Sequence, residues 1–242
     1  MDIVYMDTES KRMVLKGSSS GDLTNKVEFT EFIDKSERCI NKELYPFSKP
    51  HSAAFLDLNG DCLSDLFFTS YSGDEKFHEV WLRTDYSKYC LIFYNPVDSE
   101  SSQVTFADFN RDGRIDYIYT IKNKLYLQRN RLSAPNINGN DCVSAGTSGI
   151  FTTPEEIKFN IPKEVVKLHE DEIYGATIRV GDYNLDGHPD ILFTWETKGE
   201  SPATYLCETN SGLNYDTCTL LSNTARAAAF FDIDEDGLVL SY

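Results

Sequence analysis

The chain has 242 residues, of which 40% are hydrophobic and 13% aromatic, and this is enough apolar material for a globular domain with a substantial core. Its formal net charge is −16 at pH 7, so the backbone of a nucleic acid or an anionic membrane surface would repel it. These values exclude a disordered chain and argue against nucleic acid as a partner.

Short apolar and aromatic runs bounded by polar turns predict β-strands along most of the chain. In chain order, we expect strands at residues 2–5, 13–16, 53–56, 65–68, 80–83, 104–107, 116–119, 125–128, 177–181, 190–193, 204–207 and 228–231. Residues 17–21 and 136–149 are predicted to be surface loops. Helical structure is expected only at 153–156, as a capped turn, and at 163–169.

Four segments of the chain repeat one pattern, an apolar run followed by D-x-[ND]-x-D-G-x-x-D and a second apolar run. They are AAFLDLNGDCLSDLFFTS from Ala53, VTFADFNRDGRIDYIYT from Val104, TIRVGDYNLDGHPDILFT from Thr177 and AAFFDIDEDGLVLSY from Ala228. Their leading aspartates are 51, 74 and 50 residues apart. Each segment predicts a hairpin, and the runs at 80–83, 125–128 and 204–207 predict a third strand after it.

This spacing predicts an all-β fold, a partial β-propeller of about three and a half blades. The whole chain, 1–242, is then one partial propeller, with blade-like units at about 1–50, 51–103, 104–175 and 176–227 and an incomplete loop at 228–242. Residues 2–5 match the strand that leaves the repeated loop, so Asp2 would be the ninth residue of a loop, and we expect the chain to begin inside a blade. A fragment of a longer protein would explain this.

The repeated loops are candidate calcium sites, because calcium takes six to eight oxygen ligands and needs several carboxylates converging on one point. Side chains at positions one, three, five and nine and the carbonyl at position seven can supply them. The candidate ligands are Asp57, Asn59, Asp61, Leu63 and Asp65 in the first loop; Asp108, Asn110, Asp112, Arg114 and Asp116 in the second; Asp182, Asn184, Asp186, His188 and Asp190 in the third; and Asp232, Asp234 and Asp236 in the fourth. We expect this calcium (Ca²⁺) to be structural.

Two other interpretations of the loops are weaker. Polar hairpin turns also favour Asp, Asn and Gly, but four copies in the same strand context argue against plain turns. An EF-hand needs a Glu at position twelve and flanking helices, whereas position twelve here is Phe68, Tyr119 or Phe193. We expect the second and third loops to bind most tightly, the first more weakly because Cys62 replaces glycine, and the fourth hardly at all because Leu240 replaces the closing carboxylate.

The motifs resemble the FG-GAP/VCBS repeats of integrin-alpha propellers and, more closely, the T-cell immunomodulatory protein family, also called LINKIN. The residues that carry this likeness are PHSAAF at 50–55, FADF at 106–109, VGDYN at 180–184 and FFDIDEDG at 230–237. The resemblance covers nearly the whole chain. It implies a type I membrane glycoprotein with an extracellular propeller that serves cell adhesion and, in vertebrates, T-cell modulation. The chain departs from this family pattern in having no export signal, no transmembrane helix, no N-x-S/T acceptor and no ninth aspartate in its last loop.

The cysteines favour disulfides, because they form no CxxC pair and no zinc-type spacing with histidine. We expect Cys207 and Cys218 to pair, since one ends a predicted strand and the other starts the run that returns from a turn. Three pairings stay open for the other four: Cys39, Cys62, Cys90 and Cys142. Disulfides favour a secretory compartment, and we expect the parent protein to expose this part outside the cell.

We do not expect an enzyme, because the sequence contains no G-x-S-x-G, H-E-x-x-H or P-loop pattern. The expected partner is a protein at a cell surface, and membrane contact would need a transmembrane helix that this chain does not contain. The alternative is a glycan-binding propeller or a carbohydrate-active enzyme on this fold, with loop aromatics such as Tyr71, Tyr86 and Tyr89 stacking on sugar rings.

Overall fold

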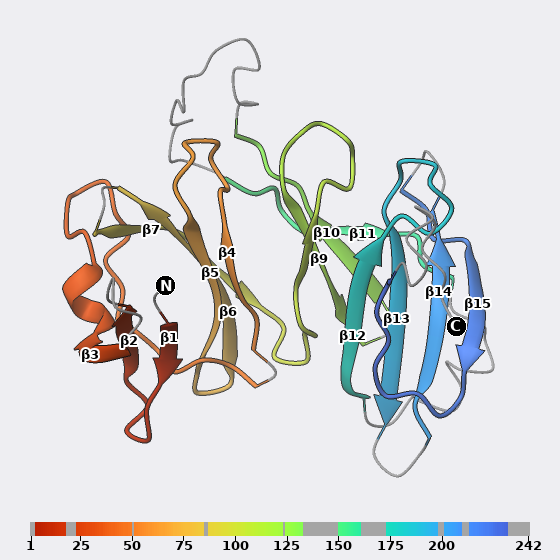
Figure 1. The fold of residues 1–242 in the computed structure, drawn as a ribbon, viewed down its shortest axis with the longest axis horizontal. Helices are drawn as coiled ribbons and strands as arrows, with labels where there is room; N and C mark the ends of the chain where they lie inside the picture. Colours follow the sequence, from red (N-terminus) through yellow and green to blue (C-terminus); the bar gives the residue numbers. More distant parts are fainter. Residues whose placement is uncertain are drawn as a thin grey trace. The chain divides into compact units, whose positions relative to one another are not determined.

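The computed structural model describes residues 3–17, 23–49, 51–84, 87–122, 124–132, 150–160, 173–197, 201–209 and 213–231. Within these ranges the chain is all-β: it forms four antiparallel sheets, one short 3₁₀-helix (η1, Phe29–Phe32) and no α-helix (Figure 1). The all-β prediction is therefore confirmed. None of the four sheets closes on itself, and the propeller with its blade count stays a prediction.

The chain divides into two compact units. The N-terminal unit (1–99 with 135–150) contains two sheets. One has the order β1-β2-β3, and the other has the order β4-β5-β6-β7. Their strands are β1 (Ile3–Met6), β2 (Arg12–Gly17), β3 (Leu23–Glu28), β4 (Ala53–Leu56), β5 (Asp65–Ser72), β6 (Glu75–Arg83) and β7 (Tyr89–Val97).

The C-terminal unit (100–134 with 151–242) also contains two sheets, each a four-stranded meander in which every strand pairs with its neighbour in the sequence. Its strands are β8 (Thr105–Ala107), β9 (Asp116–Ile121), β10 (Lys124–Gln128), β11 (Glu155–Ile157), β12 (Ile173–Gly181), β13 (Asp190–Thr197), β14 (Ala203–Glu208) and β15 (Thr217–Ser222).

Three of the four predicted hairpins and the third strands after them are confirmed. The strand expected at 228–231 does not form, since these residues belong to no strand, and the rest of that hairpin lies outside the described residues. β4 pairs with β5, β8 with β9 and β12 with β13, and the runs at 80–83, 125–128 and 204–207 lie in β6, β10 and β14. The capped turn expected at 153–156 is wrong, because Glu155–Ile157 form strand β11 and pair with β10. The expected loop at 136–149 and helix at 163–169 lie outside the described residues, as do nearly all of the loop at 17–21.

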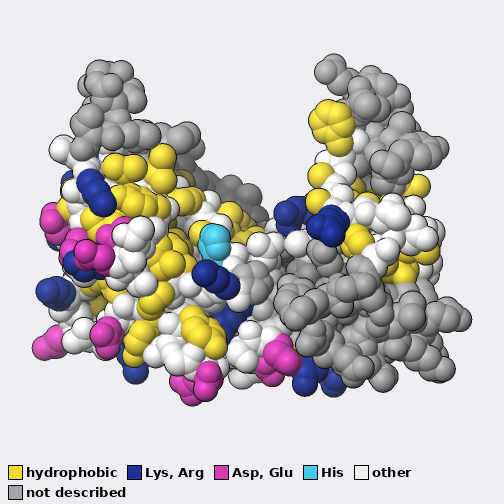
Figure 2. Space-filling model, turned by 90° about the horizontal axis from the view of Figure 1, so that it is seen from below, with side chains coloured by type: hydrophobic (Ala, Val, Ile, Leu, Met, Phe, Trp, Pro, Cys, Tyr) yellow, Lys and Arg dark blue, Asp and Glu magenta, His cyan; other side chains and the backbone are white. Residues whose placement is uncertain are grey.

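Buried apolar and aromatic side chains fill the space between the sheets of each unit. In the N-terminal unit, Phe29 of η1 packs against Phe68 of β5 and Trp81 of β6. In the C-terminal unit, Phe193 and Trp195 of β13 pack in a cluster with side chains of β9, β10 and β14. On the surface, charged side chains of both signs lie beside scattered apolar ones (Figure 2).

Two disulfides lie within the described residues. The expected bond between Cys207 and Cys218 is confirmed, and it joins directly opposite residues of β14 and β15. Sequence spacing did not predict the bond between Cys39 and Cys90. Cys62 is also disulfide-bonded.

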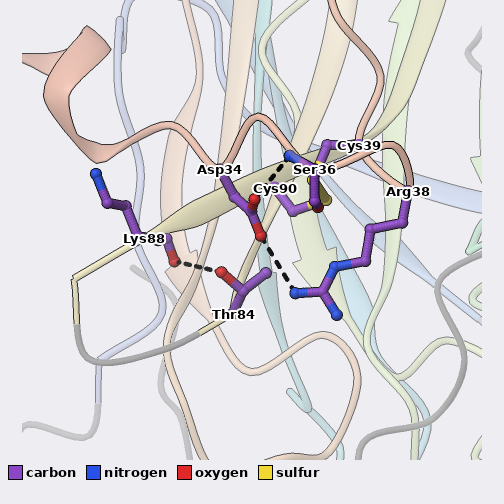
Figure 3. Close-up of a disulfide and its surroundings, with 7 residues drawn as sticks. All are labelled: Asp34, Ser36, Arg38, Cys39, Thr84, Lys88 and Cys90. Carbon is purple, nitrogen blue, oxygen red and sulfur yellow. Dashed lines mark hydrogen bonds and ion pairs between the residues drawn. A yellow bond between two sulfur atoms is a disulfide. The ribbon is translucent and has the colours of Figure 1, made fainter.

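The Cys39–Cys90 bond fastens a segment that runs along β7, the edge strand of its sheet. The Asp34 N–H donates to the Tyr89 carbonyl (2.8 Å), and the Ile40 N–H donates to the Leu91 carbonyl (2.7 Å). At the start of this segment, the Asp34 carboxylate accepts hydrogen bonds from the Ser36 N–H and the Arg38 guanidinium (Figure 3). The segment thereby occupies backbone groups of an otherwise open sheet edge.

None of the described helical structure is long and apolar enough to cross a membrane.

Candidate metal-binding loops

Three of the four predicted loops lie within the described residues, and each joins the first two strands of a four-stranded sheet. We call residues 57–65, 108–116 and 182–190 loops 1, 2 and 3. They connect β4 to β5, β8 to β9, and β12 to β13. The fourth loop, with Asp232, Asp234 and Asp236, lies outside the described residues.

The first aspartate of each loop binds the backbone of the turn that follows it. Asp57 Oδ1 accepts from the N–H groups of Gly60 (2.8 Å) and Asp61 (3.1 Å), and its Oδ2 accepts from the N–H of Cys62 (2.8 Å). In loops 2 and 3 the backbone N–H groups of positions five and six donate in the same way to Asp108 and Asp182. The aspartate at position one therefore holds the turn together, because both of its carboxylate oxygens accept backbone N–H bonds from the turn.

Positions three and five also repeat the same contacts. The Asn amide at position three donates to the Asp at position five, as in Asn59 to Asp61 (3.0 Å). The position-five carboxylate accepts the N–H of position seven, at 2.8 to 3.0 Å. The position-seven residues are Leu63, Arg114 and His188. Their predicted carbonyl ligation stays a prediction.

The ninth aspartate, the first residue of β5, β9 or β13, is fully buried in every loop. Asp65 Oδ2 accepts from the N–H of Leu58 in its own loop (2.9 Å), and Oδ1 accepts from the N–H of Arg83 at the end of β6 (2.9 Å). Asp116 and Asp190 make the same two kinds of bond, the second to Asn130 and Thr209. This carboxylate therefore fastens the loop to the third strand of the sheet.

The carboxylates of each loop lie close enough to repel one another. The pKa of Asp65 is raised to about 7 and that of Asp116 to about 6, mainly by burial and in smaller part by the acids at positions one and five of the same loop. Backbone N–H donors oppose this effect. Burial, together with Asp186 and Asp182, also raises the pKa of Asp190.

Loop 2 differs because it carries its own cation. Arg114 forms an ion pair with Asp112. Although burial opposes the shift, the hydrogen bonds from Arg114 and Asn110 hold the pKa of Asp112 below its ordinary value. Another arginine of this loop, Arg111, lies beside the His188 ring of loop 3, with 3.4 Å between its Nη1 and the histidine Nε2.

All three loops have two residues in the left-handed region, at positions four and six. In loop 1 these are Gly60 (φ 76°) and Cys62 (φ 62°). Loops 2 and 3 reverse the order: Arg111 and Leu185 occupy position four, and a glycine occupies position six. Each loop therefore places one non-glycine residue in a conformation that favours glycine. The backbone gives no reason to rank loop 1 below the others, so the expected weakening from Cys62 loses its basis.

Comparisons with known proteins relate most of the chain to one group of proteins. It is 32% identical to the T-cell immunomodulatory protein of Rattus norvegicus over 78% of its length, and 29% identical to that of Homo sapiens over the same share. The chain is a homologue of the T-cell immunomodulatory proteins. The T-cell immunomodulatory protein homolog of Plasmodium falciparum is 30% identical over 63% of the chain. No family model and no solved structure matches.

The chain spans about one third of the length of the mammalian T-cell immunomodulatory proteins, covering 33% of the rat protein and 34% of the human one. It spans 26% of the Plasmodium falciparum homolog.

In this T-cell immunomodulatory protein homologue, no group of three or more His, Cys, Asp or Glu side chains among the described residues is arranged to hold a metal ion. The hydrogen bonds give the reason: the position-one and position-five carboxylates face backbone N–H groups of their own turn. What sequence reasoning missed is the bond from the ninth aspartate to the third strand. The ninth aspartate and its donor there are 18, 14 and 19 residues apart in the three loops, so the sequence offered no fixed spacing that would have indicated this bond.

Proposed function

We propose that this chain is a non-catalytic, calcium-stabilised module of a propeller-like extracellular protein that recognises a protein partner at the cell surface. The observation that carries the proposal is the threefold repetition of one loop, in which a fully buried aspartate sits beside two further acids. Within the described ranges, no basic side chain forms an ion pair with Asp65, Asp116 or Asp190. A cation would remove the repulsion that adds to the effect of burial on their pKa values.

The donor set fits calcium. Positions one, five and nine present carboxylates and position three an amide oxygen, and hard oxygen donors on a short loop are what calcium prefers. Bound calcium would compete with the backbone N–H groups for the acids at positions one and five. Because the ninth aspartate also fastens the third strand, we propose that occupancy stabilises the whole hairpin.

The arrangement of strands supports a propeller. Each described four-stranded sheet is a meander, the usual form of a propeller blade. Within the C-terminal unit the first strands of its two sheets are neighbours, and the Thr105 hydroxyl of β8 donates to the Ile178 carbonyl of β12 (2.9 Å). First strands of successive blades line the axis of a propeller, so this contact is the one that such a ring requires.

Compartment and role rest on two further observations. Disulfides such as Cys39–Cys90 and Cys207–Cys218 persist outside the cytosol and favour an extracellular or secreted domain. The mammalian relatives are named T-cell immunomodulatory proteins, and we propose an immunomodulatory or adhesive role for the parent protein. The residues expected for glycan binding give it little support: Tyr89 stacks on Phe29 beside the core and Tyr86 lies outside the described residues, which leaves Tyr71, 38% exposed on β5.

Calcium titration followed by thermal melting tests the proposal. Calcium at tenfold over the dissociation constant should stabilise the chain by about 1.4 kcal/mol per site, with half-saturation at ~0.1–1 mM as in other extracellular modules. Asp186→Ala should remove much of the gain in melting temperature, and Asp112→Ala should do the same for loop 2.

Asp7→Asn is the matched control. Asp7 accepts two backbone N–H bonds in the turn after β1, as the loop acids do, but it belongs to no repeated loop. It should leave the calcium response unchanged. A melting temperature that ignores calcium, or an equal loss in all three variants, would show that the loops are plain turns.

A further inference from the structure

The segment at residues 34–40, which lies along β7, is joined to that strand by few backbone contacts. Two backbone hydrogen bonds connect it to Tyr89 and Leu91 among the described residues. On its other side β7 pairs with β6 through a register of eight residue pairs. The segment therefore depends on the Cys39–Cys90 bond far more than a strand of the sheet would.

The two sulfur atoms of this disulfide differ in access. Cys90 is 1% exposed, whereas Cys39 is half-buried and lines a pocket of about 410 Å³. Ile33, Leu44 and Trp81 also line the pocket, together with charged side chains of both signs. A small uncharged thiol can therefore approach Cys39 Sγ, whereas Cys90 Sγ is closed to it.

A hydroxyl group lies beside the accessible sulfur. Ser36 Oγ is 3.2 Å from Cys39 Sγ (Figure 3). Once the disulfide is open, this hydroxyl can donate to a Cys39 thiolate, and a hydrogen bond to the charged form favours that form. Of the two cysteines, Cys39 is therefore the better placed to exist as a thiolate.

The Cys207–Cys218 bond is the opposite case. Cys207 is fully buried in the core cluster of the C-terminal unit, and Cys218 packs against the same cluster. The bond joins opposite residues of β14 and β15, whose register of five residue pairs also holds these strands together. Its reduction should be slower and should change the backbone little.

We propose that the Cys39–Cys90 bond is a thiol-exchange site whose reduction by a small dithiol releases residues 34–40 from β7. One thiolate of the dithiol attacks Cys39 Sγ. A bond forms between these two sulfurs, the Cys39–Cys90 bond breaks, and its electron pair goes to Cys90 Sγ, which takes up a proton.

The second thiolate of the dithiol then attacks the sulfur that is bound to Cys39. This step closes a disulfide within the reductant and releases Cys39 as a thiolate beside Ser36. The protein gains two thiols, and the dithiol is oxidised to a disulfide. The proposal does not depend on calcium binding.

Reduction would free one side of β7. The carbonyls of Tyr89 and Leu91 would lose their donors in the segment, while the register between β6 and β7 would remain. A strand with free backbone groups can pair with another strand. The disulfide would thus act as a redox-sensitive switch that decides whether this sheet edge is open.

Partial reduction with dithiothreitol under native conditions tests the difference in access. New thiols are trapped with N-ethylmaleimide at timed intervals, and peptide mapping locates them. Cys39 and Cys90 should be labelled on the order of tenfold faster than Cys207 and Cys218, because exchange depends on access to the attacked sulfur. The described residues contain no free cysteine before reduction, so labelling at these four positions reports reduction alone.

Hydrogen exchange detects the release of the segment. In the selectively reduced chain the amides of Asp34 and Ile40 should lose their protection, whereas the amides that join β7 to β6 should keep theirs. Oxidised dithiothreitol should restore the protection. A variant with Cys39→Ala and Cys90→Ala should show the unprotected pattern with or without dithiothreitol. The matched control, Cys207→Ala with Cys218→Ala, should respond to dithiothreitol as the unmodified chain does.

Three results would overturn the proposal. Equal rates of labelling for the two disulfides would show that only unfolding exposes them. Reduction of Cys39–Cys90 with unchanged exchange at residues 34–40 would show that hydrogen bonds alone hold the segment. A response to dithiothreitol in the variant that lacks Cys39 and Cys90 would show that another disulfide controls it.

Discussion

The buried ion pair between the two sheets of the N-terminal unit allows a quantitative test. Arg12 of β2 and Glu79 of β6 are 3% and 2% exposed. The guanidinium donates to both carboxylate oxygens, at 2.8 and 2.9 Å, and also to the Tyr45 carbonyl. Glu79 accepts further hydrogen bonds from Trp81 Nε1 (2.9 Å) and from the Ser70 hydroxyl.

Arg12→Met should destabilise the chain by about 3–5 kcal/mol, because it leaves the Glu79 charge buried with only two neutral donors. For a chain of this size that corresponds to a fall in melting temperature of about 6–20 °C. Adding Glu79→Gln should recover part of the loss, because the uncompensated charge is then gone. Urea denaturation of the two single variants and the double variant measures both effects. A loss below 1 kcal/mol in Arg12→Met, or equal additive losses in the double variant, would refute the buried-charge explanation.

Two more predictions concern single features of the fold. Burial lowers the pKa of His78 to about 3, so the unfolded chain takes up a proton first as the pH falls below ~6.5. As the pH falls, the free energy of unfolding of the wild type should therefore drop by up to about 1.4 kcal/mol more per pH unit than that of His78→Leu. Denaturation between pH 6.5 and 5 measures this difference. Parallel pH profiles of the two proteins would contradict the prediction. Replacing both Cys207 and Cys218 by Ala opens a loop with a sequence separation of 11 and should cost about 3 kcal/mol. An unchanged midpoint in urea would show that the bond adds nothing.

Local signals in the sequence predicted the hairpins well. Each aspartate loop lies between two apolar runs that are only a few residues apart. The turn-forming residues of the loop and the apolar residues on either side of it are therefore enough to predict that β4 pairs with β5 and β12 with β13. The Cys207–Cys218 bond was predictable for the same reason, since it closes a hairpin. Each of these features depends on residues close together in the chain.

Features that depend on distant residues were not predictable. Residues 153–156 have the composition of a helix start, yet Glu156 pairs with Tyr126 of β10, because the sheet offers backbone partners that a single turn does not. The Cys39–Cys90 bond has a sequence separation of 51 and could not be chosen among three connectivities. Of the candidate site, the loop positions were predictable, whereas the left-handed conformation of both position four and position six could be read only from the backbone.

The segment that the Cys39–Cys90 bond holds along β7 affects how strongly newly made chains tend to aggregate. It covers a sheet edge that could otherwise pair with other chains and start aggregates. Among the described residues only this bond fixes the cover covalently, while backbone hydrogen bonds hold it non-covalently, so the edge is less well protected before oxidation. Newly made chains that have not yet formed the bond would therefore be the form most exposed to aggregation, and an oxidising folding compartment would serve to protect them.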